Sequence, residues 1–384
     1  MYVENFKLVT FSRSGFVTIS PNLTCLISGT NLTKTTLEGD GRSCVCLQGW
    51  YGKDCGLPQS FSASTFPWIR NQLKRRTRPR RVINAININN ELELFEIRVW
   101  ELHHVVDIFL VCESNYTAAG EEKPLRLFKN LQNGFLQEFQ KKIVYVFLDH
   151  FPEDGRLNGW AADNYLRTFL GQQGLSQLSS LNDDDLFVLN DADEIPKAEV
   201  LEFLRQYDGY PEPISLKMKW YLYGFFWQEL KKTIRIRAVS TIKVLKEVWK
   251  NDAIELRREN MLETYRRTSN NNYSVSLNPW FLGSNEFHAG WHCSWCFSPA
   301  GIQIKLRSAQ EDDGIRWGDF PEKYNLVYIK TLIRDGLWFD NTKTVVKRNV
   351  FSYDDAPYYA LKNAERFKHL LQNPFVEEEE NAKI

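Results

Sequence analysis

A short apolar stretch that ends abruptly in acidic residues constrains the fold of this chain more than any other feature. The run 185–190 predicts a buried strand, because it is short, mostly apolar and bounded by polar residues. Asp191, Asp193 and Glu194 follow it directly. Since strand side chains alternate between two faces, Asp191 and Asp193 are expected side by side at the carboxyl edge of the strand. Open α/β sheets bind their ligands at that edge.

Two neighbouring carboxylates at a sheet edge need a partner for their charge. They repel each other unless a proton, a cation or a basic side chain intervenes. Hard divalent ions prefer oxygen ligands, and Mg²⁺ or Mn²⁺ sites often bridge to phosphates. Asp191 and Asp193 therefore indicate a metal–diphosphate site of the Asp-X-Asp type that sugar-nucleotide transferases use. The alternative is an ordinary acidic turn, which the preceding acidic run 183–185 favours.

Strand and helix patterns alternate along the chain before the acidic residues. This alternation predicts an α/β fold in which a mostly parallel sheet is flanked by helices. The expected strands are 82–88, 105–112 and 143–148, and the expected helices are 92–102 and 159–170. After Pro196 we expect a helix at 198–207, strands at 214–220 and 233–239, a loop at 256–272, and buried segments at 302–306 and 326–333.

Composition narrows the possible classes of protein. Of the 384 residues, 43% are hydrophobic and 14% are aromatic, which supports a sizeable packed core. Lys+Arg and Asp+Glu both total 48, so the net charge is zero and gives no general attraction to nucleic acid. The sequence has no run of 18 apolar residues, so no segment is expected to span a membrane.

Changes in residue composition and apolar pattern divide the chain into four expected parts. These are a small Cys-rich segment at 1–60, a basic linker or stem at 61–81, a large folded domain at 82–374 and a disordered acidic tail at 375–384. The basic run 74–81 lies between two differently composed regions, which favours a solvated linker over a phosphate- or membrane-binding segment.

Cysteine spacing in the first segment points to an oxidising compartment. Cys44, Cys46 and Cys55, with the Gly and aromatic residues between them, resemble the C-terminal half of an epidermal-growth-factor-like (EGF-like) module that is truncated here. With Cys25 upstream, four cysteines allow three pairings, and the resemblance favours Cys25–Cys44 and Cys46–Cys55. A zinc site is the alternative, although zinc sites prefer two-residue gaps within a ligand pair. Disulfides imply an oxidising compartment.

A second cysteine pair and four glycosylation acceptors agree with that compartment. We expect Cys293 and Cys296 to form a tight disulfide, with a zinc site or a redox-active pair as the alternatives. This pairing leaves Cys112 as a buried free thiol. Asn-X-Ser/Thr acceptors for N-glycosylation occur at Asn22, Asn31, Asn115 and Asn272.

Aromatic, basic and acidic side chains elsewhere are candidates for substrate contacts. Trp220 and Trp227, in a very aromatic segment, are the best candidates for stacking on sugar rings, with a core position as the alternative. His292 is a candidate third metal ligand, since imidazole suits transition ions. Asp319 is the first candidate for a general base, with a solvated loop as the alternative.

Eight segments taken together resemble one known family. They are similar to glycosyltransferase family 17 over about residues 80–372, and their combination is far more specific than an Asp-X-Asp pattern alone. The family usually has Asp where this chain has Asn190, which leaves Asp191 and Asp193 intact. The segments are 80–87, 111–117, 145–151, 163–170, 191–196, 222–227, 290–296 and 316–319.

The resemblance implies a GT-A-like fold for residues 82–374, which would be the catalytic domain, and a defined chemistry. The implied reaction is the transfer of GlcNAc from UDP-GlcNAc, with Mn²⁺ or Mg²⁺, to the 4-hydroxyl of the core β-mannose of N-glycans. The donor linkage is α and the product linkage is β, so inversion is implied. The resemblance also implies the Golgi lumen and a type II membrane protein, whose anchor is not in this sequence; a trimmed or secreted form is then expected.

The resemblance and the residues together assign expected roles. Asp193, with Asp191 and His292, is expected to hold the metal ion, and Asp319 is expected to take the proton of the acceptor. The expected substrate contacts are Asn84, Glu113 and Arg167 for the donor, and Trp220, Trp227 and Trp317 for the acceptor. Two rival functions remain: a non-catalytic glycan-binding or adhesion protein, and a metal-dependent hydrolase that uses the acidic pair.

Overall fold

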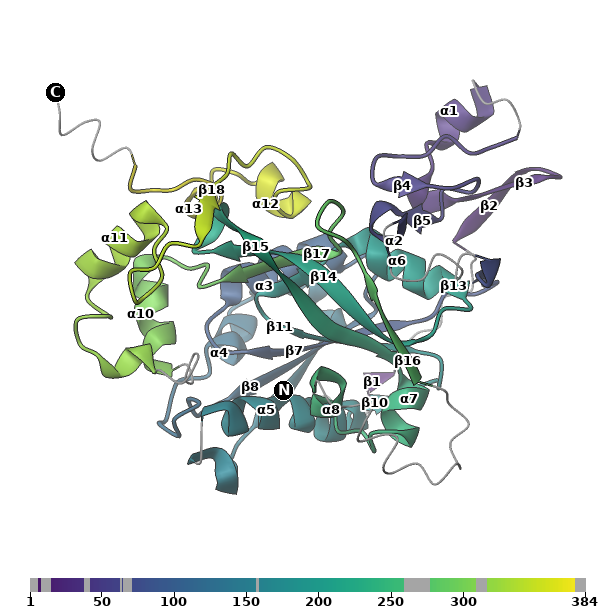
Figure 1. The fold of residues 1–384 in the computed structure, drawn as a ribbon. Coiled ribbons are helices and arrows are strands. Elements are labelled where there is room, and N and C mark those ends of the chain that lie inside the picture. Colours follow the sequence, from purple (N-terminus) through teal and green to yellow (C-terminus); the bar gives the residue numbers. More distant parts are fainter. Residues whose placement is uncertain are drawn as a thin grey trace.

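A mixed sheet of ten strands, counted over the described residues, organises the fold (Figure 1). The computed structural model describes residues 6–7, 15–37, 42–62, 64, 71–156, 159–258, 277–308 and 316–376. The strands of the sheet are β7 (Val82–Ile88), β8 (Ile108–Ser114), β9 (Ile143–Leu148), β11 (Leu186–Asp191), β12 (Glu194–Pro196), β14 (Glu212–Leu222), β15 (Gly224–Thr241), β16 (Leu277–Leu282), β17 (Gly290–Ser294) and β18 (Val345–Lys347). Their order is β12-β17-β14-β15-β11-β7-β8-β9, with β16 beside β14 and β18 beside β15.

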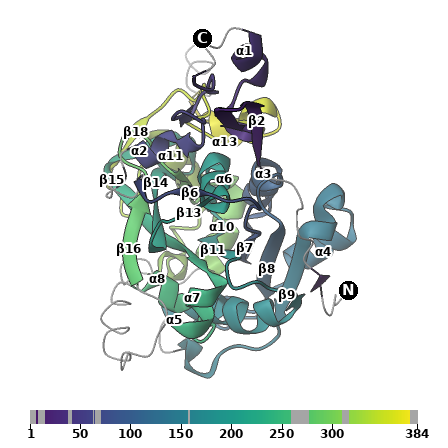
Figure 2. The same ribbon diagram turned by 90° about the vertical axis from the view of Figure 1, so that its right-hand side faces the viewer.

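One half of the sheet is parallel, as the sequence predicts. Strands β11, β7, β8 and β9 pair in parallel, and their residues are almost all buried because helices cover both faces. Helices α3 (Leu92–Leu102) and α6 (Ala198–Gln206) pack on one face (Figure 2). The other face is covered by α5 (Gly159–Phe169), α7 (Ile242–Glu247) and α8 (Ile254–Arg257). The carboxyl ends of the four strands therefore meet at one edge.

The other half of the sheet is not parallel, and this corrects the expectation of a mostly parallel sheet. Strands β14 and β15 form a long antiparallel pair, and β15 also runs antiparallel to β11. The expected strand at 233–239 is only the last part of β15. The apolar pattern of a buried strand is the same for either direction, so the sequence pattern alone does not distinguish the two arrangements. The mixed α/β class is confirmed.

Helices from the C-terminal third cover the antiparallel half. Helices α10 (Pro299–Ser308) and α11 (Leu326–Asp335) pack against β14 and β15, so the expected buried segments 302–306 and 326–333 are helical. Helices α12 (Tyr358–Lys362) and α13 (Lys368–Leu371) lie against α3 and β17. Figure 1 shows α10 and α11 together at one end of the sheet.

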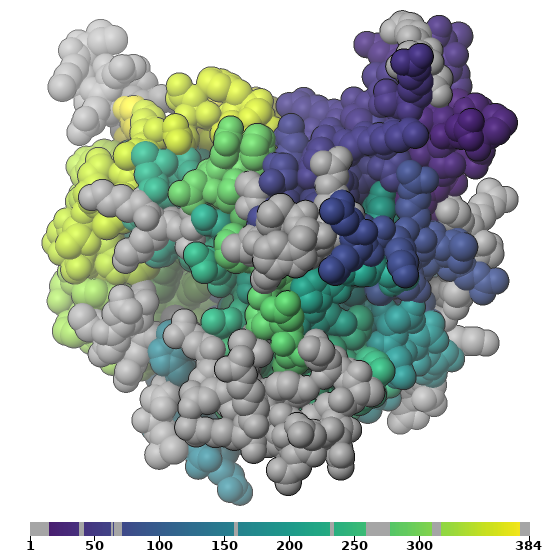
Figure 3. Space-filling view, turned by 45° about the vertical axis from the view of Figure 1, so that its right-hand side comes forward, coloured from purple at the N-terminus to yellow at the C-terminus, as the bar shows by residue number. Residues whose placement is uncertain are grey.

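The Cys-rich segment forms a small lobe, coloured purple in Figure 3. The disulfides Cys25–Cys44 and Cys46–Cys55 are present as predicted, and they enclose a small apolar cluster. The hydroxyl of Tyr207 donates to Oδ2 of Asp54 at 2.7 Å, which ties the lobe to the main body. The lobe contains β2 (Phe16–Ser20), β3 (Leu23–Leu26), α1 (Leu32–Leu37), β4 (Trp50–Tyr51), β5 (Leu57–Pro58) and α2 (Gln59–Ser62).

The basic run 74–81 is docked on the protein, which corrects the expectation of a solvated linker. Strand β6 (Lys74–Arg75) pairs with β13 (Tyr207–Asp208). Arg76 and Arg80 both form ion pairs with Asp208. Arg81 is buried and pairs with buried Asp185 at the start of the central strands. The run is therefore held by acidic partners on neighbouring segments.

Several expectations concern positions that are exposed or lie outside the described residues. Asn22 is exposed, whereas Asn31 and Asn115 are half-buried; their glycosylation stays a prediction. Asn272, residues 65–70 and residues 377–384 lie outside the described part of the chain. Over the described ranges, no helix combines the length and the apolar character that a membrane span requires.

The buried Arg81–Asp185 pair gives a test of the fold. Asp185 accepts a bond of 2.8 Å from Nε of Arg81 and another of 2.7 Å from the backbone N–H of Asn182. We expect Asp185→Asn to lower the free energy of unfolding by about 3–5 kcal/mol, because the buried guanidinium loses its counter-charge. Asp183→Asn, at an exposed carboxylate in the same run, is the matched control and is expected to change it by less than about 0.5 kcal/mol. Urea denaturation measures both; equal effects would contradict the buried-pair argument.

Candidate active site

A buried arginine holds the turn that carries the acidic residues. Strand β11 ends at Asp191 and β12 begins at Glu194. Arg98, from α3, donates to the backbone carbonyls of Asp191, Ala192 and Glu194 at 2.6, 3.2 and 2.7 Å. Burial lowers the pKa of Arg98 to about 10, so the side chain remains charged at neutral pH. The turn is therefore fixed through its backbone, which leaves its acidic side chains to face outward.

Asn84 belongs to this support and not to the cavity wall, which corrects its expected donor contact. Its side-chain oxygen accepts from Nη1 of Arg98 at 3.1 Å. Its side-chain nitrogen donates to the carbonyl of Val188 at 2.9 Å and to Oδ1 of Asn190 at 3.2 Å. Asn84 is fully buried and absent from the cavity lining, so it orients Arg98 from below the turn.

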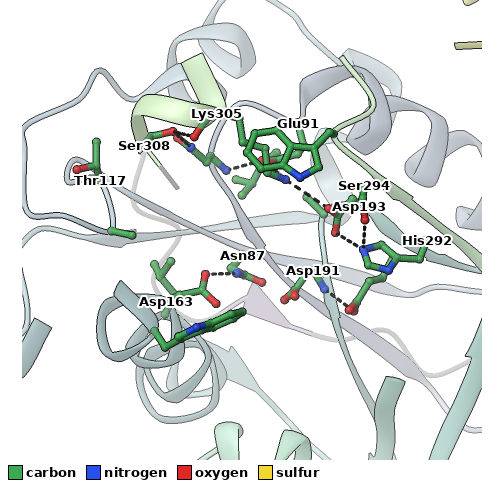
Figure 4. A pocket seen from close by; sticks show the side chains of 18 of the residues that line it. Asn87, Glu91, Thr117, Asp163, Asp191, Asp193, His292, Ser294, Lys305 and Ser308 are labelled. Atoms are coloured by element: carbon green, nitrogen blue, oxygen red, sulfur yellow. Dashed lines mark hydrogen bonds and ion pairs between the residues drawn. The ribbon is translucent and has the colours of Figure 1, made fainter. Parts of the chain in front are cut away.

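A cavity of about 580 Å³ lies over the carboxyl edge of the parallel strands (Figure 4). Both Asp191 and Asp193 line it, as the sequence predicts. A volume of this size is typical of a small-molecule site. The cavity extends from the ends of β7, β8 and β9 to the antiparallel half of the sheet, so the acidic turn lies at the junction of the two halves.

Asp191 is held by two arginines. Arg167, from α5, donates from Nη2 to both carboxylate oxygens at 2.8 Å, and Arg257, from α8, approaches Oδ2 at 3.3 Å. Burial by itself raises the pKa of Asp191, but the two guanidinium groups outweigh that effect and hold the pKa below its ordinary value. Arg167 lines the cavity as expected, although its charge is shared with Asp191 and Asp163.

Asp193 stands between a lysine and a histidine. Nζ of Lys305, from α10, lies 3.3 Å from Oδ2 of Asp193 and 3.2 Å from Oε1 of Glu91. Nε2 of His292, from β17, lies 3.6 Å from Oδ1 of Asp193 and 3.2 Å from Oγ of Ser294. Burial opposes the charge, yet Lys305 and His292 hold the pKa of Asp193 well below its ordinary range. The same pairing raises the pKa of His292. Figure 4 shows these groups facing one another across the cavity wall.

The donor set around Asp193 fits a divalent ion only in part. Across the described residues, no group of three or more His, Cys, Asp or Glu side chains is arranged to hold a metal. Oδ1 of Asp193 and Nε2 of His292 are 3.6 Å apart, which is within reach of one ion whose ligands each lie about 2 Å away. Mg²⁺-type sites commonly use one or two protein ligands together with phosphates. These residues therefore fit an ion whose coordination a diphosphate completes.

Glu113 and Trp227 have structural positions, which corrects their expected substrate contacts. Glu113 is buried and accepts from the backbone N–H groups of Leu127 and Phe128 at 2.9 and 3.0 Å, so it caps the start of α4 (Arg126–Gln132). Trp227 is buried in the core beneath α11, where its indole nitrogen donates to the carbonyl of Ile333 at 2.7 Å. Neither residue lines the cavity.

Asp319 lies away from the cavity wall. Its side chain is 57% exposed and accepts a bond of 2.8 Å from Nη1 of its near neighbour Arg316. Trp317 and Trp220, by contrast, line the cavity, and their contact with the acceptor stays a prediction. The disulfide Cys293–Cys296 is present, and Cys112 is a buried free thiol, both as predicted. Burial raises the pKa of Cys112, which keeps the thiol protonated.

Several cavity residues have no distinctive local signal in the sequence. Lys305 lies on an ordinary amphipathic helix, and Arg98 on a helix whose other residues are mostly core. Trp295 and Trp338 join the cavity wall from loops next to β17 and α11. Glu229 lies within β15 between Gln228 and Leu230, in a polar stretch that resembles an ordinary solvent-facing position. Only the fold brings these side chains to one place.

Comparison with known proteins decides the family. The model of glycosyltransferase family 17 matches residues 65–252, which include the parallel strands and the acidic turn. Residues 65–252 belong to glycosyltransferase family 17. The family 17 resemblance expected from the sequence motifs is thereby confirmed. No solved structure matches the chain, so the GT-A-like assignment stays a prediction.

Curated relatives extend the likeness beyond the family 17 region. The chain is 48% identical over 337 residues to the beta-1,4-mannosyl-glycoprotein 4-beta-N-acetylglucosaminyltransferase of Rattus norvegicus. The aligned region covers 87% of this chain and 62% of that relative. The proteins of the same name from Homo sapiens and Mus musculus are each 47% identical to it over 337 residues. The aligned region again covers 87% of this chain, and it covers 63% of the human protein and 62% of the mouse protein. The chain thus spans a little over three fifths of these relatives.

The Arg98 support gives a test of how the family 17 turn is built. Arg98→Lys removes the planar guanidinium, whose Nη2 reaches three carbonyls while Nη1 reaches Asn84, so we expect the free energy of unfolding to fall by about 2–4 kcal/mol. The exposed Arg258→Lys, which keeps a partner at Glu255, is the matched control and is expected to be near neutral. Chemical denaturation followed by fluorescence measures both. An Arg98→Lys protein as stable as its control would show that the buried fork does not hold the turn.

Proposed function

We propose that this protein is an inverting transferase that moves GlcNAc from UDP-GlcNAc to the 4-hydroxyl of the core β-mannose of N-glycans. The observation that carries the proposal is the 47–48% identity, over 87% of the chain, to relatives named as that transferase. The cavity supports it independently, because an acidic turn, several cations and five tryptophans line one continuous space. These tryptophans are Trp160, Trp220, Trp295, Trp317 and Trp338.

The two ends of the cavity suit the two substrates. The end formed by β7, β8 and β9 offers Asn87, Ser114 and Tyr116, polar side chains suited to a nucleoside. The other end carries four of the five tryptophans, Trp220, Trp295, Trp317 and Trp338, whose flat aromatic faces suit sugar rings. The acidic turn lies between the two ends, so the donor diphosphate is assigned to the middle, with its sugar directed toward Trp220.

The residues at the middle of the cavity are assigned to the diphosphate. Asp193 and His292 would hold Mn²⁺ or Mg²⁺, which when bound offsets the negative charge that develops on the departing UDP. Lys305 and Arg167 add fixed positive charge at the same place. Asp191 keeps Arg167 in position. This arrangement stabilises a leaving diphosphate because the positive groups are already oriented before the reaction.

The setting follows from the same proposal. We assign the protein to the Golgi lumen, where N-glycans are modified, with residues 82–374 as the catalytic domain and residues 1–60 as an EGF-like accessory segment. Support comes from the three disulfides, which require an oxidising compartment. The Asn-X-Ser/Thr acceptors at Asn22, Asn31 and Asn115 agree with it.

Mass spectrometry of a biantennary N-glycan incubated with the chain, UDP-GlcNAc and Mn²⁺ tests the proposal. We expect the mass of one N-acetylhexosamine to be added, and Asp193→Asn to lower the rate by a factor of about 10²–10³, because the side chain that would hold the metal ion loses its charge. Asp183→Asn, exposed and in the same acidic region, is the matched control. No added mass with the unaltered chain would refute the transferase proposal.

The same experiment separates the two rival functions. A glycan-binding or adhesion protein leaves both UDP-GlcNAc and the glycan unchanged, and its thermal stability does not respond to UDP with Mn²⁺. A metal-dependent hydrolase releases free GlcNAc even when the glycan is present. Retention of full activity by Asp193→Asn would remove the acidic turn from the mechanism while leaving the transferase assignment in place.

A further inference from the structure

One row of side chains crosses the sheet beneath the cavity. Each member of the row is paired with the next one on the adjacent strand. In order, the members are Val345 of β18, Glu229 of β15, Trp220 of β14, His292 of β17 and Glu194 of β12. Paired residues on neighbouring strands project to the same face of a sheet. All five residues line the cavity. The register therefore fixes their order along the cavity floor, with Trp220 between Glu229 and His292.

We propose that Glu229 is the general base that accepts the proton of the acceptor hydroxyl. This inference rests on the proposed function. It gives Glu229 the role of general base, because Asp319 is exposed and lies outside the cavity. Glu229 is only 5% exposed and lines the cavity on the opposite side of Trp220 from Asp193 and His292. An inverting reaction needs its base on the side of the reacting carbon away from the leaving group.

Spacing across the sheet supports this position. Two inter-strand steps separate Glu229 from His292, or roughly 10 Å at about 4.8 Å for each step. The indole of Trp220 lies parallel to the His292 ring, at 7° between planes and 6.3 Å between centroids. Trp220 thus offers a flat surface for the transferred sugar between the diphosphate and the base.

Most other described carboxylates of the cavity pair with cations, and Asp163 shares Arg167 with Asp191. Glu91 and Asp193 share Lys305, Asp191 pairs with Arg167, and Glu194 pairs with Arg257 at 2.7 Å. A carboxylate beside a fixed cation is a weak base, because the cation stabilises its charged form. Asp340 also lines the cavity, but it is exposed and accepts two bonds from Thr342, which lower its pKa. Glu229 has interactions of its own, and its assignment rests on its position.

Transfer of GlcNAc to the acceptor hydroxyl needs no reactant besides the donor and the acceptor. The 4-hydroxyl oxygen of the acceptor forms a bond to the anomeric carbon while its proton passes to Glu229. The bond between that carbon and the diphosphate oxygen breaks, and its electron pair leaves with UDP. Burial of Glu229 next to Trp220 limits access by water, which favours transfer to a sugar over hydrolysis.

Turnover of Glu229→Gln tests the assignment. With the biantennary glycan and UDP-GlcNAc, we expect kcat to fall by a factor of about 10²–10⁴, the usual contribution of a general base. Binding of UDP, measured by calorimetry, is expected to be unchanged, which also reports that the variant is folded. Glu229→Asp, which keeps a carboxylate on a shorter side chain, is expected to recover part of the lost rate. Glu322→Gln, at an exposed glutamate outside the cavity, is the matched control.

Azide rescue distinguishes a base from a structural residue. Azide is already an anion and needs no deprotonation, so Glu229→Ala with UDP-GlcNAc and azide is expected to form β-GlcNAc azide faster than the unaltered chain does. A purely structural role predicts no such product.

Two outcomes overturn the assignment when the unaltered chain transfers GlcNAc. One is that Glu229→Gln transfers it at the same rate. The other is that Asp319→Asn or Asp340→Asn shows the loss of rate and the azide rescue instead. If the unaltered chain itself transfers nothing, the proposed function fails and not this inference alone.

Discussion

The site depends on one buried cation beneath a backbone turn. Arg98 has no access to solvent and binds three carbonyl oxygens of residues 191–194. A buried charge is costly unless its donors find partners. Both terminal nitrogens of Arg98 do so, and they hold the turn from below. Because Arg98 binds the backbone of the turn, the side chains of Asp191 and Asp193 are left to meet other cations in the cavity. Asn84 and Asn190 complete the support in the strands beneath.

Charge balance in the cavity follows from that arrangement. Acidic side chains from the turn meet Arg167, Arg257 and Lys305, which come from three different helices. Helices α5 and α8 pack on one face of the parallel half and α10 packs on the antiparallel half, so the turn is the place where their charged side chains converge. The result is a set of matched charges that keeps several carboxylates ionised. An anionic ligand entering such a site meets cations that are already held in place, so it binds without large rearrangement.

The sequence predicted the parallel half of the sheet well and the antiparallel half poorly. Strands β7, β9 and β11 and helix α3 were predictable because short apolar runs and helical spacing are local signals. The direction of β14 and β15 was not, since an apolar strand pattern is the same in either direction. Among the site residues, Asp191, Asp193, His292, Trp220 and Trp317 were predicted and do line the cavity. Glu113, Asn84 and Trp227 were expected there but serve the core.

The sequence by itself determined the acidic turn at the end of a strand, the disulfide pairs and the family, because each rests on residues close together in the chain or on a set of motifs. Tertiary structure alone decided which charges meet at the turn and which acid stands across the cavity from it. Arg98, Lys305 and Glu229 are distant from one another in sequence, and no local pattern marks any of them. Their roles arise from helix packing and strand register, which bring together residues that the sequence keeps far apart.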